Sequence, residues 1–271
     1  MQESYEKGLA THSRAGVSGN WYPYRDQGQV RRQNRLPHER VAPTLEKIPF
    51  SVYDFFAYLS SGAVLVATAD YVLGLGLLTQ KEPGPVLAVL LIILAYVCGH
   101  IVAHFSSFIL EHIAVGRILR RPAALLLGEP PRWVGFAWVF PNYFRAFPQE
   151  TRRRINQKAE LRGFEGKGEG LFLHVYPIVT SSSELQSRLD GFRNQYGFAR
   201  NMSFAFFVAS STILIAHRFA NHPVRLRWAV LASAGAVTLF YRYLKFFRQY
   251  SYELFLRYAE LPMRNTDPKE K

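Results

Sequence analysis

PVLAVLLIILAYVCGHIVAHFSSFIL, residues 85–110, is the stretch that decides the fold. From Val86 to Leu110 it contains no Asp, Glu, Lys or Arg. The hydrocarbon core of a bilayer is about 30 Å thick, and an α-helix needs about 20 apolar residues to cross it. The sequence therefore predicts a membrane-spanning helix here, which continues through residues 111–121 and stops before Pro122.

Three further apolar segments accompany this span. Residues 55–78 form the first expected span, and residues 202–216 and 228–241 form two shorter ones. The shorter segments become long enough if basic side chains at their ends extend to the interface, namely Arg200, Arg218, Arg242 and Lys245. We expect an all-α membrane protein with four transmembrane helices in two hairpins and a small, mainly helical cytoplasmic subdomain.

Composition divides the chain into five segments. They are a disordered basic cytoplasmic tail (1–47), a first transmembrane hairpin (48–120), a cytoplasmic or interfacial loop domain (121–198), a second transmembrane hairpin (199–247) and a cytoplasmic amphipathic helix with a tail (248–271). Within the loop domain, QETRRRINQKAELR (149–162) predicts a basic helix and LFLHVYPIV (171–179) a strand or buried loop. Ser181 and Glu184 have the spacing of a capping box, which would start a helix that runs into the third span.

Charge predicts the orientation. The chain has 33 Lys and Arg against 20 Asp and Glu, a net charge of +13. Fourteen of the basic residues lie between 111 and 200 and eight in residues 1–54, but one in 79–85 and three in 217–227. Because basic loops stay in the cytoplasm, we expect both termini and the large loop on the cytoplasmic side of a bacterial inner membrane. The three basic residues at 217–227 leave open a re-entrant second hairpin. The net charge favours anionic lipid over nucleic acid as a partner.

A polar stripe runs along the second span. At 100° per residue, five side chains share one face, namely Tyr96, His100, His104, Ser107 and Glu111. The first span offers a matching face with Asp54, Tyr58 and Ser61. Three interpretations remain open: hydrogen bonds between helices, a water-lined or proton-conducting path, and a divalent metal site. The metal ligands would be Asp54, His104, Glu111 and His112, although no HExxH motif is present.

Small residues and one buried acid suggest contacts between helices. Asp70 is the only charge within the first span and a second functional candidate. Small side chains that allow close helix approach occur on spans one and four, namely Ala63, Ala67, Gly74, Ala232, Gly235 and Ala236. We therefore expect a homo-oligomer.

No nucleophile motif or phosphate-binding loop is present, and GFEGKGEG (163–170) lacks the residue order of such a loop. Anionic lipid contact is expected from the basic clusters Arg31, Arg32, Arg35 and Arg152, Arg153, Arg154. The sequence favours a non-enzymatic oligomeric membrane component, such as a scaffold, a channel-like protein or a membrane effector subunit, which receives a protein partner on its basic cytoplasmic face. The alternatives are a metal-dependent membrane enzyme and a small proton-coupled transporter. No cofactor is expected outside the metal alternative.

Overall fold

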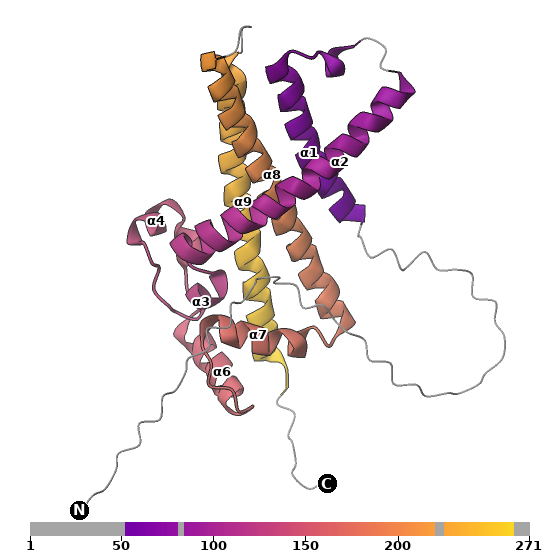
Figure 1. Ribbon diagram of the computed structural model, residues 1–271. Helices are drawn as coiled ribbons and strands as arrows, with labels where there is room; N and C mark the ends of the chain where they lie inside the picture. Colours follow the sequence, from indigo (N-terminus) through magenta and orange to yellow (C-terminus); the bar gives the residue numbers. More distant parts are fainter. Residues whose placement is uncertain (1–51, 81–83, 220–224, 263–271) are drawn as a thin grey trace, which may run out of the picture. The chain divides into compact units, whose positions relative to one another are not determined.

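The computed structural model describes residues 52–80, 84–219 and 225–262 (Figure 1). All regular elements in these ranges are helices, which confirms the predicted all-α class. They are α1 (Val52–Leu73), the 3-10 helix η1 (Leu77–Thr79), α2 (Pro85–Ser106), the π-helix η2 (Ser107–Leu119), α3 (Pro122–Leu126), α4 (Val134–Val139), α5 (Pro141–Phe144), α6 (Gln149–Glu160), α7 (Gly168–Val179), α8 (Ser183–Phe219) and α9 (Leu226–Glu260). The predicted basic tail, with Arg31, Arg32 and Arg35, lies outside the described residues, as does the chain after Pro262.

The four long helices α1, α2, α8 and α9 form one bundle (Figure 1). α1 packs along α2, and α8 packs along α9. α1 also contacts α8, so the two hairpins share an interface. α2 continues without a break into η2, which runs diagonally across α8 (Figure 1).

Three helical stretches are long and apolar enough to cross a membrane, namely Phe55–Leu73, Pro85–Leu126 and Ser183–Phe219. This supports the expectation of a membrane protein. α9, the fourth expected span, is not among the three, although it is 35 residues long. Arg227 and Arg242 flank its apolar part, residues 228–241, which is therefore short, and the charged residues of the rest lower the hydropathy of the helix.

α1 ends at Leu73, earlier than predicted for the first span. Gly74 and Gly76 follow with φ angles of 66° and 68°, a conformation that residues with a Cβ rarely adopt. The carboxylate of Asp70 accepts hydrogen bonds from the N–H groups of Leu77 and of the next residue (2.7 and 3.3 Å). Residues 74–78, which were expected to continue the first span, therefore form a turn closed by Asp70.

The helix of the second span ends before Pro122, as the sequence predicts, but its type changes from α-helix to π-helix along its length. α2 begins with Pro85 at its first position, and η2 ends at Leu119 before Arg120, which has a φ of 78°. From Ser107 the backbone is a π-helix, with i→i+5 hydrogen bonds that widen each turn. The 100° spacing that defined the polar stripe no longer applies beyond Ser107.

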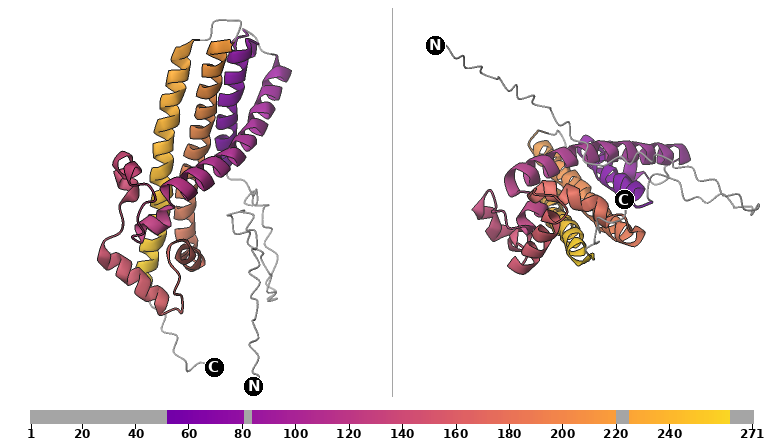
Figure 2. Two further views of the ribbon diagram at one scale, coloured as in Figure 1. Left: turned by 60° about the vertical axis from the view of Figure 1, so that its left-hand side comes forward. Right: turned by 90° about the horizontal axis from the view of Figure 1, so that it is seen from below.

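The short helices form a subdomain around the C-terminal part of α9 (Figure 2). α3, α5, α6 and α7 each contact α9. Tyr243, Phe255 and Tyr258 of α9 have no exposed surface and lie in the core, together with Ile155 of α6. α6 is the basic helix that the sequence predicts.

α7 corrects the prediction of a strand or buried loop at residues 171–179. Leu171, Val175 and Val179 are all buried, and their spacing of four residues places them on one helical face. Pro177 lies inside this helix. Burial of this face against the core therefore outweighs the β-branched composition and the proline.

α8 runs unbroken from Ser183 to Phe219, as predicted for a helix that continues into the third span. The predicted boundaries after residues 198 and 247 fall inside α8 and α9, so neither separates two folding units. The hydroxyl of Ser181 donates to the carbonyl of Ile178 (2.8 Å) at the end of α7 instead of forming the predicted capping box.

Candidate functional site

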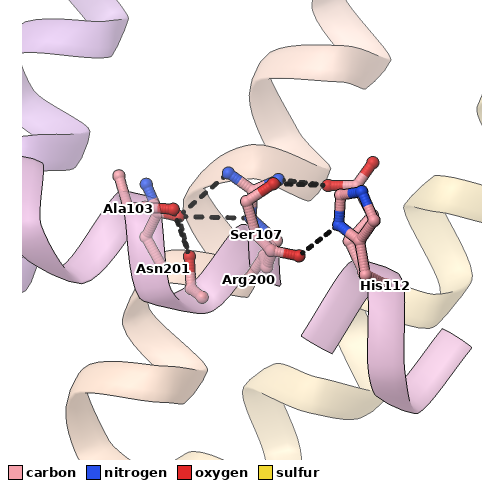
Figure 3. A network of polar contacts seen from close by, with 7 residues as sticks. Ala103, Ser107, His112, Arg200 and Asn201 are labelled. Carbon is pink, nitrogen blue, oxygen red and sulfur yellow. Dashed lines mark hydrogen bonds and ion pairs between the residues drawn. The ribbon is translucent and has the colours of Figure 1, made fainter. Parts of the chain in front are cut away.

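A buried polar network joins the second span to α8, at the point where α2 becomes the π-helix η2 (Figure 3). Glu111 is the first charged residue after the uncharged stretch 86–110, and Arg200 is the last charged residue before the apolar stretch 202–216. The two side chains form an ion pair, with Arg200 Nη1 2.5 Å from Glu111 Oε2. The charged residues that flank these two apolar stretches, Glu111 and Arg200, therefore neutralise each other.

Uncharged groups extend the network on both sides of the ion pair (Figure 3). Nε and Nη2 of Arg200 both donate to Asn201 Oδ1 (3.3 Å each), which also accepts from Ser106 Oγ (2.7 Å). On the η2 side, Ser107 Oγ donates to Glu111 Oε2 (3.3 Å). The network thus connects one turn of α2 and one turn of η2 to two adjacent residues of α8.

Burial makes these contacts necessary. Arg200 is 5% exposed, Asn201 3% and Ser106 0%. A buried charge without a partner costs several kcal/mol, whereas a paired and hydrogen-bonded charge is tolerated. Arg200 is one of the side chains that could extend to the membrane interface, and its guanidinium pairs with Glu111. The network fixes the position of η2 against α8.

The predicted polar stripe divides into separate contacts. The ring of His100 stacks on Tyr58 of α1 (centroids 4.2 Å apart) and meets Tyr96 edge-on (4.6 Å). His104 is exposed and lies beside Phe105 (5.6 Å). Ser107 and Glu111 belong to the network with α8. The stripe therefore faces α1 near its start and α8 near its end, because the helix passes from one neighbour to the other.

The remaining polar candidates of α1 form hydrogen bonds with the backbone of α1 and of the turn that follows it. Ser61 is fully buried and donates to the carbonyls of Ala57 and Tyr58 (3.0 and 3.1 Å). Asp70 is 7% exposed and closes the turn after α1, as described above. The side chain of Asp54 lies outside the described residues.

The proposed metal ligands have other neighbours. Nδ1 of His112 lies 3.3 Å from the carbonyl oxygen of Ser107, and its ring stacks on Phe108 (6.3 Å). Glu111 is held by Arg200 and Ser107. Among the side chains that the structure describes, no three His, Cys, Asp or Glu residues are placed to hold a metal ion.

A close contact between α1 and α2 involves glycines that the sequence reasoning missed. A Cβ added to Gly62 of α1 would overlap the backbone of Ala95, and one added to Gly99 of α2 would overlap the backbone of Tyr58. The two helices therefore cross backbone to backbone at these positions, as small residues permit in membrane helices. Both glycines are buried. Their signal in the sequence is a glycine in the interior of each apolar span; Gly99 is the single glycine of residues 86–110, whereas Gly62 shares the first expected span with Gly74 and Gly76.

The predicted small-residue faces have different surroundings. Ala232 and Ala236 of α9 are buried, and the carbonyl of Ala236 accepts from Ser203 Oγ of α8 (2.8 Å). A Cβ on Gly235 would reach the ring of Phe206 of α8 (3.4 Å). The predicted small residues of the first span are exposed, namely Ala63 and Ala67 of α1 and Gly74 in the turn after it.

The basic residues of the subdomain serve several purposes. Arg153 and Arg154 of α6 are exposed, whereas Arg152 is half-buried. Lys158 is 2% exposed and donates to the carbonyls of Tyr258 (2.7 Å), Ala259 (3.5 Å) and Leu261 at the end of α9. Burial, with a smaller effect of Arg162, lowers the pKa of Lys158. This lysine caps the C-terminal carbonyls of α9.

Tyr143 joins α5 to the end of η2. Its hydroxyl donates to the carbonyl of Arg120 (2.9 Å), and its ring is 4% exposed. Burial raises the pKa of Tyr143 well above its usual value, so the phenol stays protonated.

Comparisons of the chain with protein families, with curated proteins and with solved structures find no match.

Proposed function

We propose that the chain is a non-enzymatic, oligomeric component of a bacterial inner membrane. It has four transmembrane helices and a basic, mainly helical subdomain on the cytoplasmic side, where a protein partner docks. The observation that carries the proposal is the continuity of α8 and α9, which belong both to the helical bundle and to the subdomain core. A movement of the subdomain is therefore transmitted to the spans without a flexible linker.

Helix length supports this arrangement. α8 has 37 residues, which at 1.5 Å per residue gives about 55 Å. The hydrocarbon core takes up about 30 Å of such a helix. The polar part of α8 before Arg200 therefore extends beyond the membrane, on the side where the subdomain lies. α9 spans with it as the fourth helix if Arg242 and Lys245 lie at headgroup depth.

The polar network supports a structural role for the stripe. Glu111 is already bonded to Arg200 and Ser107, so this carboxylate is not presented to a substrate. Charge supports the cytoplasmic side for the subdomain, because residues 111–200 contain 14 Lys and Arg.

Self-association would use the exposed small residues of α1. Ala63 and Ala67 are both exposed, and Ala67 borders a cavity that it shares with residues of α8 and α9. The small residues of α9 are engaged by α8. A second copy of this chain can approach closely at this face.

Two experiments test the proposal. Reporters fused after Gln80, Gly168 and Lys271 should give a periplasmic signal only at Gln80. A periplasmic signal at Gly168 would reject the orientation, and one at Lys271 would reject a spanning α9.

For self-association, a cysteine replaces Ala63 in a Cys98→Ala background. Mild oxidation in native membranes should yield a disulfide-linked dimer. The matched control places the cysteine at Leu214, an exposed position of α8 (49%), and should remain monomeric. Equal cross-linking at both positions would indicate random collision and reject the α1 interface.

A further inference from the structure

A basic pocket of about 940 Å³ lies between α5, the segment that joins α5 to α6, and α9. Its walls include three cationic side chains, Arg145, Lys245 and Arg248. None of the described residues that line it is Asp or Glu. Within the described ranges none of the three cations forms an ion pair with a carboxylate. Pockets of this volume accommodate small ligands.

Arg248 is held in place at the pocket by its neighbours. Its Nη2 donates to the backbone carbonyl of Arg145 (2.8 Å), and its guanidinium lies over the ring of Tyr252 (5.7 Å). That ring stacks on Phe147 (4.8 Å), which is 4% exposed. Nε of Arg248 is buried and has no hydrogen-bond partner among the described residues.

The start of α6 adds to the positive potential. Pro148, the residue before α6, lines the pocket, and no side chain caps the first N–H groups of this 12-residue helix. The positive end of the helix dipole therefore lies at the pocket, together with the cations.

The pocket lies at headgroup depth in the proposed membrane arrangement. Tyr241, at the end of the apolar part of α9, lines its inner wall. At 1.5 Å per residue, Lys245 lies about 6 Å and Arg248 about 10 Å further along the axis of α9. Each headgroup layer extends about 5–8 Å beyond the hydrocarbon core, so Lys245 lies within this layer and Arg248 just outside it. The aromatic helix α4, with Trp138 88% exposed, ends next to the pocket at Phe140. Exposed tryptophan is typical of the interface.

We infer that this pocket binds a phosphate group, presented by an anionic phospholipid of the cytoplasmic leaflet or by a soluble phosphate. Arg145, Lys245 and Arg248 surround the phosphate. The inference uses the proposed function only for the depth of the pocket in the membrane. The phosphate chemistry comes from the cations and the uncapped start of α6.

The test uses the full chain in a zwitterionic detergent. In the lipid arm, phosphatidylglycerol is added and bound lipid is counted by native mass spectrometry, with phosphatidylcholine as the neutral comparison. The variant Arg145→Gln, Lys245→Gln removes two cations and leaves Arg248 in place. It should bind phosphatidylglycerol about 30-fold more weakly than wild type, since each basic residue at a membrane surface contributes a several-fold factor.

Two further variants separate the pocket from surface charge and from misfolding. Arg162→Gln, Lys167→Gln removes the same charge from exposed positions of the subdomain outside the pocket, and should bind within about 2-fold of wild type, as expected for charges that do not touch the ligand. Arg145→Lys, Lys245→Arg keeps the charge and should keep most of the binding.

The soluble arm measures the thermal unfolding midpoint with added inorganic phosphate. A phosphate-dependent rise in wild type that is absent in Arg145→Gln, Lys245→Gln, without selective lipid loss, would assign a soluble phosphate to the pocket. Equal losses in both double variants, or no loss in either arm, would overturn the inference. The reporter result at Gly168 does not depend on these side chains, so a failed binding test and a failed topology remain distinguishable.

Discussion

The pair α8 and α9 is held together in two different ways along its length. In the part that belongs to the bundle, the contact uses small residues and serine hydroxyls. Ser203 Oγ donates to the carbonyl of Ala236 (2.8 Å), and Ser210 Oγ donates to that of Ala229 (3.0 Å) and meets Ser233 Oγ (2.7 Å).

In the part that belongs to the subdomain, the same two helices meet through aromatic rings. Tyr196 of α8 contacts Phe247 and Tyr250 of α9 (5.0 and 5.8 Å between centroids), and Tyr243 is fully buried. The solvent explains the difference. Water drives large apolar rings together, whereas lipid gives no such driving force, so close backbone approach and hydrogen bonds take its place. The Glu111–Arg200 network lies where one mode gives way to the other.

The first prediction concerns the subdomain part of the α8–α9 pair, which is packed through aromatic rings. Phe255→Ala removes a ring with no exposed surface and should lower the free energy of unfolding by about 4 kcal/mol, since the cavity adds to the lost transfer energy. Denaturant unfolding in detergent micelles measures it. The control is Phe207→Ala in the bundle half, where the ring is 59% exposed. Its loss should be much smaller, and equal losses would contradict the division into two modes.

The second prediction concerns the boundary network. Glu111→Leu leaves the Arg200 guanidinium buried without its carboxylate and should lower the free energy of unfolding by about 3 kcal/mol. The double variant Glu111→Leu, Arg200→Met replaces both charges by apolar groups and should recover most of this loss.

A double-mutant cycle in the same micelles checks this coupling. The matched control is Glu150→Leu, which removes an exposed carboxylate of α6 and should change stability little. If the two network substitutions add independently, the ion pair is not the reason for the loss at Glu111.

The sequence predicts the helices better than it predicts their partners. The apolar run from Val86, the basic helix α6 and the continuation of α8 all follow from local composition. The pairing of Glu111 with Arg200 does not, because residues 89 positions apart meet only after the helices pack.

The polar stripe shows the same limit. Its projection at 100° per residue holds for Tyr96 and His100, which share the neighbour Tyr58. Beyond Ser107 the π-helix changes the angle per residue, and nothing in the composition announces that change. Ser107 and Glu111 still lie together, since their side chains form a hydrogen bond. Gly62 and Gly99 were overlooked for a related reason. A glycine reveals a close crossing only when the facing helix is known.

The last prediction concerns the bundle half and has the smallest effect. Ser210→Ala removes two hydrogen bonds between α8 and α9, yet it should lower the free energy of unfolding by only about 0.6 kcal/mol, the mean for such bonds between membrane helices. The reason is the reference state. A helix that separates from its neighbour inside lipid stays helical, and its serine bonds back to its own carbonyls, so little is lost when the hydroxyl is absent.

Ser210→Val sharpens the comparison, because it removes the same hydroxyl and adds a branch at a 5% exposed position. Overpacking there should cost about 2 kcal/mol. If close approach holds this half together, the valine variant must be clearly less stable than the alanine variant. If the hydroxyl holds it together, the two variants should be equally unstable, since both lack the same bonds. Unfolding of both variants in one micelle system decides between these explanations, and we expect the valine to be the more damaging.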